Sequence, residues 1–274
     1  MLVLPLHSSL TPEEQQRVFD PAPPGMVKVV VSTNIAESSV TISDIVAIVD
    51  SGKVKELRYD AQKRMSLLET NPSSRASATQ RRGRAGRVAP GRCYRLYSRP
   101  MLEGMPDRSI PEIQRMELQH TCLSAKSVLP MLPVQDVLAS AMDPPAAENV
   151  KMALDQLENL GAIVSESGVF TKDGEEVEAA TVLGRRLADL PVPPAVGKML
   201  IMGLFLKCMD PATTIAALLG SRSPFVASPL KREQSRRVQK EFDASSDIEA
   251  AMKAYEAWED VIHEEGFKQA SRWA

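Results

Sequence analysis

The sequence predicts an α/β fold at the start of the chain, followed by a mostly helical region. Short β-branched runs alternate with helix signals in the first part, and a strand, helix, strand order implies a right-handed layer of parallel strands. The composition changes near Pro106, after which apolar residues recur at helical spacing. A chain of 274 residues is long enough for about two domains with real cores.

Four segments carry the strand signal. The first, residues 2–6, stands at the very beginning, which predicts that the chain starts inside a domain. Residues 27–31 and 45–49 are β-branched runs of the kind that is buried on both faces of a parallel sheet. Residues 93–97 are the fourth candidate. A helix should begin at Thr11-Pro12 and stop before the proline-rich segment 21–25, because proline cannot continue a helix.

The second part predicts a helix and then a hairpin. Asp-Pro-Pro at residues 143–145 marks a helix start, and apolar residues follow at a spacing near 3.6 until Gly161. The turn-prone residues 165–168 separate two short apolar runs, 163–164 and 169–171, and so predict a small hairpin. A helix followed by a hairpin suits a winged-helix module. Helical patterns then cover residues 183–190, 194–208 and 211–219, and an amphipathic stretch runs from residue 233 to the end.

Composition excludes several classes of function. A net charge of -2 predicts no general attraction to nucleic acid or acidic membranes, and 4% aromatic residues are too few for a stacking platform that binds single strands. The longest strongly apolar segment, residues 199–206, falls far short of the ~20 residues of a membrane span. Cys93, Cys122 and Cys208 lack the spacing of a disulfide framework or a zinc cluster. They favour a reducing intracellular compartment, cytoplasm or nucleus, with the mitochondrion left open.

The near-zero total charge hides a segregated pattern. Residues 241–265 hold nine acids and one base, Lys253. Residues 71–102 hold no acid and eight arginines, namely Arg75, Arg81, Arg82, Arg84, Arg87, Arg92, Arg95 and Arg99. The chain should therefore carry one electropositive patch and one acidic helix.

Residues 80–87, Gln-Arg-Arg-Gly-Arg-Ala-Gly-Arg, are the most informative segment. On a helix, Gln80, Arg84 and Arg87 would share one face, so two guanidinium groups and an amide would point together. Arginine grips phosphate oxygens with a planar fork, and beside a transferring phosphoryl group it can act as an arginine finger. Gly83 and Gly86 cost ~1 kcal/mol each inside a helix, which fits a place that a ligand approaches closely. The alternative is an ordinary solvated or general phosphate-binding face.

Residues 32–42, rich in serine and threonine, follow the strand 27–31 at its carboxyl end. Ligands of open α/β sheets bind at this end of the strands. Short hydroxyl and amide side chains can contact phosphate and ribose there, although the same cluster can simply cap a helix.

Together with Leu-Pro-Leu-His-Ser-Ser-Leu at residues 4–10, these segments resemble motifs four, five and six of superfamily-two helicases. The closest resemblance is to the DEAH/RHA group of DExH-box RNA helicases, because motif six begins with Gln80-Arg81, where DEAD-box relatives have histidine. Residues 143–145 and 183–191 resemble the winged-helix and ratchet region of that group. Residues 41–44 and 223–226 resemble the RNA helicase A and G-quadruplex-resolving branch, so the likeness extends over nearly the whole chain.

The resemblance implies a fold and an activity. Residues 1–107 would form the second RecA-like parallel-sheet domain, truncated at its N-terminus, residues 108–178 a winged-helix domain, and residues 179–274 part of an α-helical ratchet domain. The implied function is ATP-driven translocation on RNA and unwinding of RNA. The rival reading is a non-catalytic scaffold of helicase descent that binds RNA or protein through the arginine patch.

The resemblance also implies roles at the nucleotide. Arg84 and Arg87 would be arginine fingers, and Gln80 would help to hold the γ-phosphate or the attacking water. Phe19 stands where family members stack a ring on adenine, with core packing as the alternative. Thr41 stands at a nucleotide contact. The family's ribose-binding aspartate position is Ser43 here, with Asp44 beside it, and the resemblance leaves open which of the two takes that role.

Further roles concern RNA and partners. The RNA backbone would be held by Ser8, Ser9, Thr33 and Asn34, and residues 53–70 correspond to a hairpin that protrudes towards nucleic acid in the family. The sequence contains neither the phosphate loop G-x-x-x-x-G-K-[ST] nor an Asp-Glu-x-His box, which supply the phosphate cradle and the magnesium ligand. The chain alone is therefore predicted to be inactive and to hold no metal. ATP with Mg²⁺ should bind together with the missing first RecA-like domain, and protein cofactors or a larger ribonucleoprotein complex are further possible partners.

Overall fold

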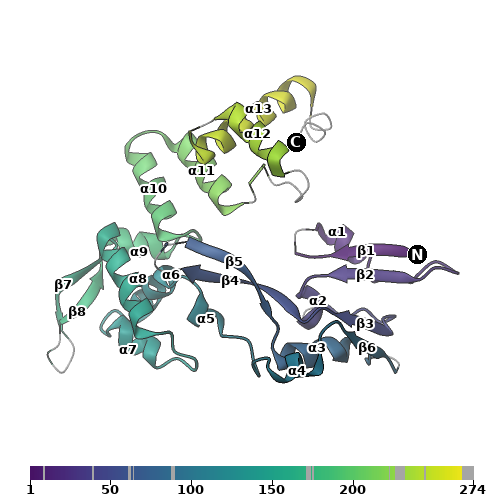
Figure 1. The fold of residues 1–274 in the computed structure, drawn as a ribbon. Helices are drawn as coiled ribbons and strands as arrows, with labels where there is room; N and C mark the ends of the chain where they lie inside the picture. Colours follow the sequence, from purple (N-terminus) through teal and green to yellow (C-terminus); the bar gives the residue numbers. More distant parts are fainter. Residues whose placement is uncertain are drawn as a thin grey trace. The chain divides into compact units, whose positions relative to one another are not determined.

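The structure is a computed structural model, and it divides into two compact units, Met1–Glu117 and Leu118–Ala274 (Figure 1). Each unit is described by itself. Among the described residues, no helix combines the length and the apolar character needed to cross a membrane. The described residues are 1–8, 10–38, 40–60, 63, 65–87, 90–170, 174, 176–221, 223–225, 232–243 and 245–266.

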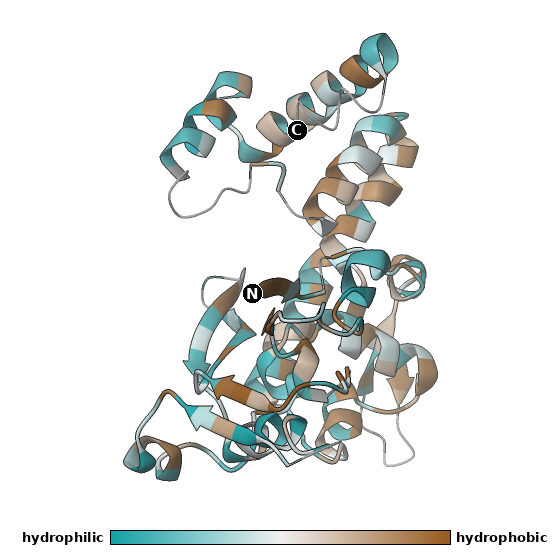
Figure 2. Cartoon of the chain, turned by 90° about the vertical axis from the view of Figure 1, so that its right-hand side faces the viewer, coloured by the Kyte–Doolittle hydropathy of each residue, from teal (hydrophilic) through white to brown (hydrophobic). Residues whose placement is uncertain are grey.

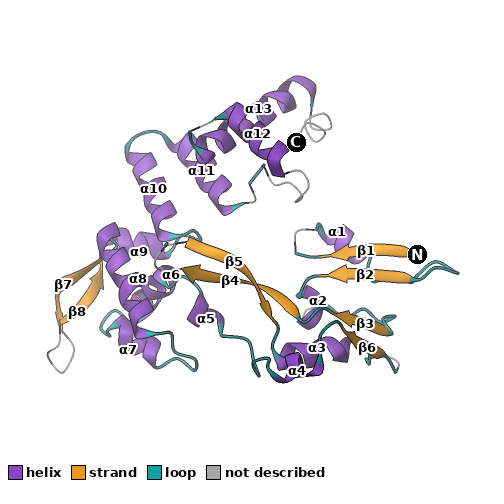
Figure 3. Ribbon diagram, in the orientation of Figure 1, coloured by secondary structure: helices purple, strands orange, loops and turns teal. Residues whose placement is uncertain are grey.

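All four predicted strands of the first unit are present, and they form two parallel pairs (Figure 3). Strand β1 (Leu2–Leu6) pairs with β2 (Lys28–Ser32), and β3 (Ala47–Asp50) pairs with β6 (Arg92–Arg95). The predicted parallel arrangement is therefore confirmed. Parallel pairing needs a long connection between the strands, and the segments that separate these strands in the sequence supply it.

Helix α1 (Pro12–Gln16) begins where the sequence predicts. Thr11 and Glu14 form a capping box, in which each side chain accepts a hydrogen bond from the other residue's backbone N–H. The turn after the helix buries Val18 against Leu4 and Leu6 of β1. This small core fixes the start of the unit, and Ile35 of helix α2 (Ile35–Ser38) packs against it.

One expectation about the strands is wrong. The β-branched runs were expected to be buried on both faces, yet the side chain of Val49 is 66% exposed and that of Val31 is 61% exposed. Each parallel pair is only two strands wide in the described residues, so alternate side chains have no second layer to cover them. Figure 2 shows that β1, next to the N-terminus, is a hydrophobic strand.

Strands β4 (Lys53–Asp60) and β5 (Met65–Pro72) form the hairpin expected over residues 53–70. Their ladder begins at the pair Lys53 and Pro72, and β5 leads straight into helix α3 (Arg75–Arg84). Gly52, just before β4, has φ +68°, and a Cβ there would lie 2.5 Å from Cδ1 of Tyr97. Only glycine fits this turn without displacing the ring.

Helix α3 is shorter than predicted. It ends at Arg84 with Ala85 as its C-cap, so Gly86 and Arg87 lie beyond the helix. The backbone N–H of Gly86 bonds to the carbonyl of Gly83, an i to i+3 contact that tightens the end of the helix. Two glycines within four residues make further helix costly, which explains the early end. The unit closes with α4 (Arg99–Glu103) and α5 (Glu112–Arg115).

The second unit opens with helices around a small hairpin. Helix α8 ends at Leu160 with Gly161 in the left-handed conformation, as predicted, although it begins at Ala147, shortly after the proline pair. Lys126 is buried, where its Nζ donates to the Leu132 carbonyl (2.9 Å) and pairs with Glu178 (3.5 Å). The elements are α6 (Gln119–Val128), α7 (Val134–Ala139), α8 (Ala147–Leu160), β7 (Ile163–Phe170), β8 (Glu176–Ala180) and α9 (Val182–Ala188).

The hairpin lies one strand later than predicted. Residues 165–168, expected to be its turn, fall inside β7 as an irregularity where the register shifts between Val164 and Val169. The partner of the whole strand is β8, whose Val177 is buried. Gly168 adopts φ +68°, so the turn-prone residues are absorbed as a bulge rather than a reversal. The helix followed by a hairpin, which suits a winged helix, is nevertheless confirmed.

The remaining helices follow the predicted patterns. The amphipathic stretch from residue 233 divides into two helices, because Ser246 caps a new helix and Asp243 accepts three hydrogen bonds in the break. Phe225 and Phe242 pack with their ring centroids 5.9 Å apart. The helices are α10 (Pro194–Phe205), α11 (Met209–Gly220), α12 (Arg232–Phe242) and α13 (Asp247–Glu265).

Candidate functional site

The C-terminal end of α3 gathers the two candidate finger arginines at one short segment. Nη1 of Arg84 donates to the Val40 carbonyl at 3.4 Å, and Nη1 of Arg87 donates to Oγ1 of Thr41. Gln80 lies one turn before Arg84 on the same helix and is exposed. Although Arg87 is beyond the helix, all three predicted phosphate-site residues and Thr41 are brought together.

Neither of these two arginines forms an ion pair within the described residues, although the charge of Glu37 acts on Arg84. Nε of Arg84 is buried and has no hydrogen-bond partner among the described residues. Burial, and after it the positive charge of Arg87, lower the pKa of Arg84. A buried donor without an acceptor is costly, so the end of α3 is electrostatically suited to an anion with several oxygens.

A second cluster joins the candidate base and ribose residues. Phe19 is 41% exposed, whereas its neighbour Val18 is fully buried, so core packing is not the role of Phe19. The side chain of Lys28 is only 4% exposed. Its Nζ donates to the carbonyls of Val18 (2.9 Å) and Asp20 (2.8 Å), on either side of Phe19, and pairs with Oδ2 of Asp44 (2.7 Å).

Lys28 therefore ties the Phe19 turn to the segment that carries Thr41, Ser43 and Asp44. Because the Asp44 carboxylate is occupied by Lys28, the exposed hydroxyl of Ser43 is the more accessible of the two ribose candidates. Sequence reasoning missed Lys28. A lysine at the start of an apolar strand was the available signal, since a buried lysine needs a carboxylate or carbonyl partner.

The candidate RNA residues lie at one edge of the β1–β2 pair. The backbone N–H of Thr33 donates to the Leu6 carbonyl at 3.1 Å, so the segments that follow the two strands run side by side. Ser8, Thr33 and Asn34 are exposed there, which brings these three predicted residues together. Ser9, the fourth, lies outside the described residues.

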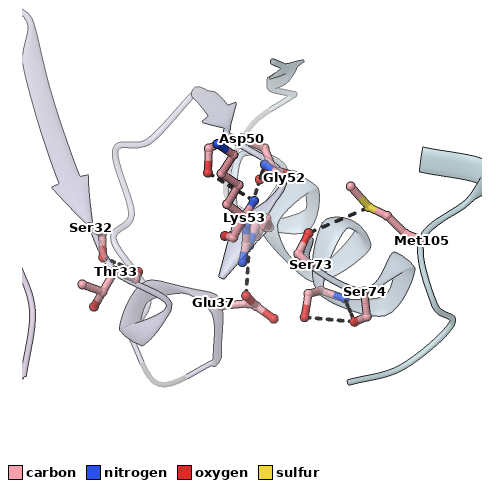
Figure 4. Close-up of polar contacts among 12 residues, drawn as sticks. Ser32, Thr33, Glu37, Asp50, Gly52, Lys53, Ser73, Ser74 and Met105 are labelled. Carbon is pink, nitrogen blue, oxygen red and sulfur yellow. Dashed lines mark hydrogen bonds and ion pairs between the residues drawn. The ribbon is translucent and has the colours of Figure 1, made fainter. Parts of the chain in front are cut away.

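Arg81 forms a network that sequence reasoning also missed. Its Nε donates to Oε2 of Glu37 (3.0 Å), and its Nη1 donates to Oδ1 of Asp50 (2.8 Å) and to the Lys53 carbonyl (3.1 Å). Figure 4 shows Glu37, Asp50 and Lys53 gathered with Gly52 at this place. The Asp50 side chain is fully buried and also accepts from Gly52 N (3.0 Å) and the Tyr97 hydroxyl (2.8 Å).

The network holds its charges in place. Burial acts to raise the pKa of Asp50, but hydrogen bonds from Gly52, Arg81 and Tyr97 hold that pKa below its usual value. Burial likewise acts to lower the pKa of Arg81, and the bonds to Asp50 and Glu37 raise it instead. The acids at positions 37 and 50 were the signal that the sequence offered, since Glu37 comes soon after β2 and Asp50 is the last residue of β3.

Comparison with known proteins shows which domains this chain resembles. A helicase conserved C-terminal domain matches residues 1–89, and a ratchet-like helicase-associated domain matches residues 193–265. The chain is therefore similar to DExH-box RNA helicases, as the motifs predict, and it combines a RecA-like domain with a ratchet-like domain.

Relatives align over most of the chain. "DExH-box ATP-dependent RNA helicase DExH1" of Arabidopsis thaliana is 45% identical over 262 residues, 95% of this chain and 25% of the relative. "Putative ATP-dependent RNA helicase DHX57" of Homo sapiens is 42% identical over 94% of this chain and 18% of its own length. "ATP-dependent DNA/RNA helicase DHX36" of Homo sapiens is 40% identical over 95% and 25%. The chain thus spans at most about a quarter of these relatives.

Proposed function

We propose that this chain completes the ATP site of an RNA-translocating motor, with Arg84 and Arg87 as its arginine fingers. The observation that carries the proposal is the end of α3, where two guanidinium groups meet the Val40–Thr41 segment and Nε of Arg84 has no partner among the described residues. A triphosphate would supply the missing acceptors and relieve the repulsion between the two arginines.

The chemistry follows from charge. Phosphoryl transfer needs stabilisation of charge on the transferring group and alignment of the attacking water. Arg84 and Arg87 would stabilise that charge, because guanidinium groups stay protonated and bind oxygens in pairs. Gln80, one helical turn from Arg84, would orient the water or a γ-phosphate oxygen. Mg²⁺, held by ligands outside this chain, would supply positive charge to the phosphate groups.

The cluster around Lys28 would bind the base and sugar of the same nucleotide, and the residues at the edge of the β1–β2 pair would bind RNA. Phe19 would stack on the base, and Ser43, with Thr41, would contact the sugar side, in register because Lys28 joins their segments. Ser8, Thr33 and Asn34, together with Ser9, would hold the RNA backbone without reading sequence. Closing and opening of two RecA-like domains around ATP would then move the chain along the strand.

The proposal has consequences for the chain alone. Because its sequence contains no phosphate loop and no Asp-Glu-x-His box, residues 1–274 by themselves should not hydrolyse ATP. The partners would be a first RecA-like domain and RNA, with protein cofactors or a ribonucleoprotein complex beyond them. The expected boundaries remain 1–107, 108–178 and 179–274. A reducing compartment fits the three free cysteines.

The test is RNA-stimulated ATP hydrolysis by the complete protein. Arg84→Ala should lower kcat at least ~10³-fold, as loss of an arginine finger does, while RNA affinity stays near that of the wild type. Arg99→Ala is the matched control, because Arg99 is exposed and pairs only with its helical neighbour Glu103 among the described residues. It should hydrolyse ATP normally.

The rival scaffold predicts a different pattern. The wild type would then show no RNA-stimulated hydrolysis, and Arg84→Ala and Arg99→Ala would weaken RNA binding alike and reduce its dependence on salt. Normal hydrolysis by Arg84→Ala in an active protein would remove the finger assignment.

A further inference from the structure

Helix α3 is attached to both strands of the β4–β5 hairpin at the root of the hairpin, where Lys53 pairs with Pro72. The attachment to β5 is covalent, because β5 ends at Pro72 and Ser73 and Ser74 lead into the helix. Ser73 and Ser74 are buried, and the Ser74 hydroxyl caps the helix by accepting from Ser77 N at 3.1 Å. Figure 4 shows Ser73 directed at Met105, to whose sulfur its hydroxyl donates.

The attachment to β4 is Arg81. Its Nη1 reaches the carbonyl of Lys53, the first residue of β4, at 3.1 Å and the Asp50 carboxylate at 2.8 Å. The Ser73 N–H donates to the Gly52 carbonyl at 2.9 Å. Lys53 is also the ladder partner of Pro72. The root of the hairpin is therefore held on both strands by the same helix.

Arg81 lies one turn before the end of α3, where Arg84 stands. The side chain is 15% exposed and makes three hydrogen bonds to three different segments, so the guanidinium fork has little freedom. Packed networks of this kind transmit displacement, because their parts do not deform independently.

We infer that Arg81 is a positioning residue that couples the finger helix to the β4–β5 hairpin. Any shift of α3 towards or away from bound phosphate moves Arg84 and, through Arg81, the root of the hairpin. The hairpin would thereby follow the nucleotide state of the site. This inference rests on the proposed function, since it assumes phosphate at the end of α3 and nucleic acid at the hairpin.

The experiment measures base pairs unwound per ATP hydrolysed by the complete protein. Arg81→Lys keeps the charge, but one ammonium group cannot replace a planar fork that serves Glu37, Asp50 and Lys53. Unwinding per ATP should fall at least ~5-fold, the lower end of typical coupling between sites, while KM for ATP stays near that of the wild type. This ratio is independent of the active fraction, so partial unfolding of the variant leaves it unchanged.

Arg82→Lys is the matched control. Arg82 is the next residue on α3 and is exposed, and its side chain makes no hydrogen bond or ion pair with the part of the chain that the structure describes. It should match the wild type. Glu37→Gln weakens one arm of the network, and combining it with Arg81→Lys should cost less than the product of the two single effects, because both act on one contact.

The outcomes separate the two claims. An active protein in which Arg81→Lys unwinds as many base pairs per ATP as the wild type overturns the coupling role and leaves the proposed function intact. A wild type without RNA-stimulated hydrolysis overturns the proposed function, and the coupling role with it. A fall in the ratio for Arg82→Lys as large as that for Arg81→Lys would also overturn the coupling role.

Discussion

Two arginines on one helix have opposite surroundings. Arg81 donates hydrogen bonds to Glu37, Asp50 and the carbonyl of Lys53. The bonds to the two carboxylates raise the pKa of Arg81 against the effect of burial. Arg84, three residues later, has one long bond of 3.4 Å and a buried Nε without a described partner, and its pKa is lowered. The fold thus satisfies the guanidinium group at one position and leaves a buried donor without a described partner at the other.

The contrast shows that the arginines of one motif can be distinguished by the hydrogen-bond partners of each guanidinium group. A buried charged group whose hydrogen bonds are all made within the fold stabilises the fold. A buried group that lacks partners lowers stability, and a ligand that supplies those partners restores it. Residues 80–87 look uniform in sequence, and only the contacts of each guanidinium group separate the two roles. Substitutions in the network of Arg81 should therefore lower the free energy of unfolding, whereas substitutions at Arg84 should lower activity and leave the free energy of unfolding nearly unchanged.

The largest expected effect is on stability at Asp50. Asp50→Ala removes the buried carboxylate that meets Arg81, Gly52 and Tyr97, and breaking a buried pair on one side costs ~3–5 kcal/mol. Arg84→Met, which keeps an aliphatic stem but no charge, should leave the first unit as stable as before or stabilise it by up to ~1 kcal/mol. Hydrogen exchange in α3 and β4, with helices of the second unit as internal reference, measures both.

The comparison between the two arginines breaks if these variants behave alike. Equal destabilisation by Asp50→Ala and Arg84→Met would mean that the fold depends on Arg84 as much as on the network of Arg81. Asp50→Asn keeps the shape and one oxygen for Gly52, so it should fall between the wild type and Asp50→Ala.

The second effect concerns Lys28 and the nucleotide. Lys28→Met keeps the buried stem but frees Asp44 and the carbonyls beside Phe19, so the base and ribose segments lose their common tie. KM for ATP should rise ~10-fold, which corresponds to ~1.4 kcal/mol of binding, with kcat little changed. Steady-state kinetics of the complete protein measures the split between KM and kcat.

Lys151→Met is the control for that variant, since Lys151 is exposed on α8 in the second unit. A loss of kcat without a change in KM in Lys28→Met would place Lys28 with the phosphate end instead of the base end.

Much of the fold followed from local signals. Prolines, capping residues and β-branched runs predict β1, α1, β2 and β3, because these choices depend on a few neighbouring residues. The position of the turn in the hairpin of the second unit did not follow. Residues 165–168 have turn chemistry, and only the pairing of β7 with β8, in which Ile163 lies opposite Ala180, decides that they form a bulge. Pairing over such a distance is a tertiary choice that overrides local preference.

The site was predictable in part for a similar reason. The motif order predicts Arg84, Arg87, Thr41 and Phe19 as one site, and the structure places Arg84 and Arg87 against the Val40–Thr41 segment. Lys28, Asp50 and Arg81 were missed because their role consists of contacts between segments far apart in sequence, such as the bond between positions 50 and 81. No periodicity or spacing within one segment reports such a contact.

The smallest expected effect is a pH dependence at Tyr97. Burial, and then the hydrogen bond to Asp50, raise the pKa of Tyr97 to about 12 from the usual 10. Because the folded state holds the phenol proton more tightly, this stabilisation is complete below pH 10 and is lost as pH rises through about 12. Tyr97→Phe should lower the unfolding free energy by ~1 kcal/mol near neutral pH. The variant should also show a smaller decline of stability between pH 10 and about 12, measured by denaturation followed with circular dichroism.

Cys93 is present in both the wild type and Tyr97→Phe, so the difference in stability between the two proteins isolates the phenol. An unchanged alkaline slope would mean that Tyr97 does not support Asp50, and that the carboxylate depends on Arg81 and Gly52 alone.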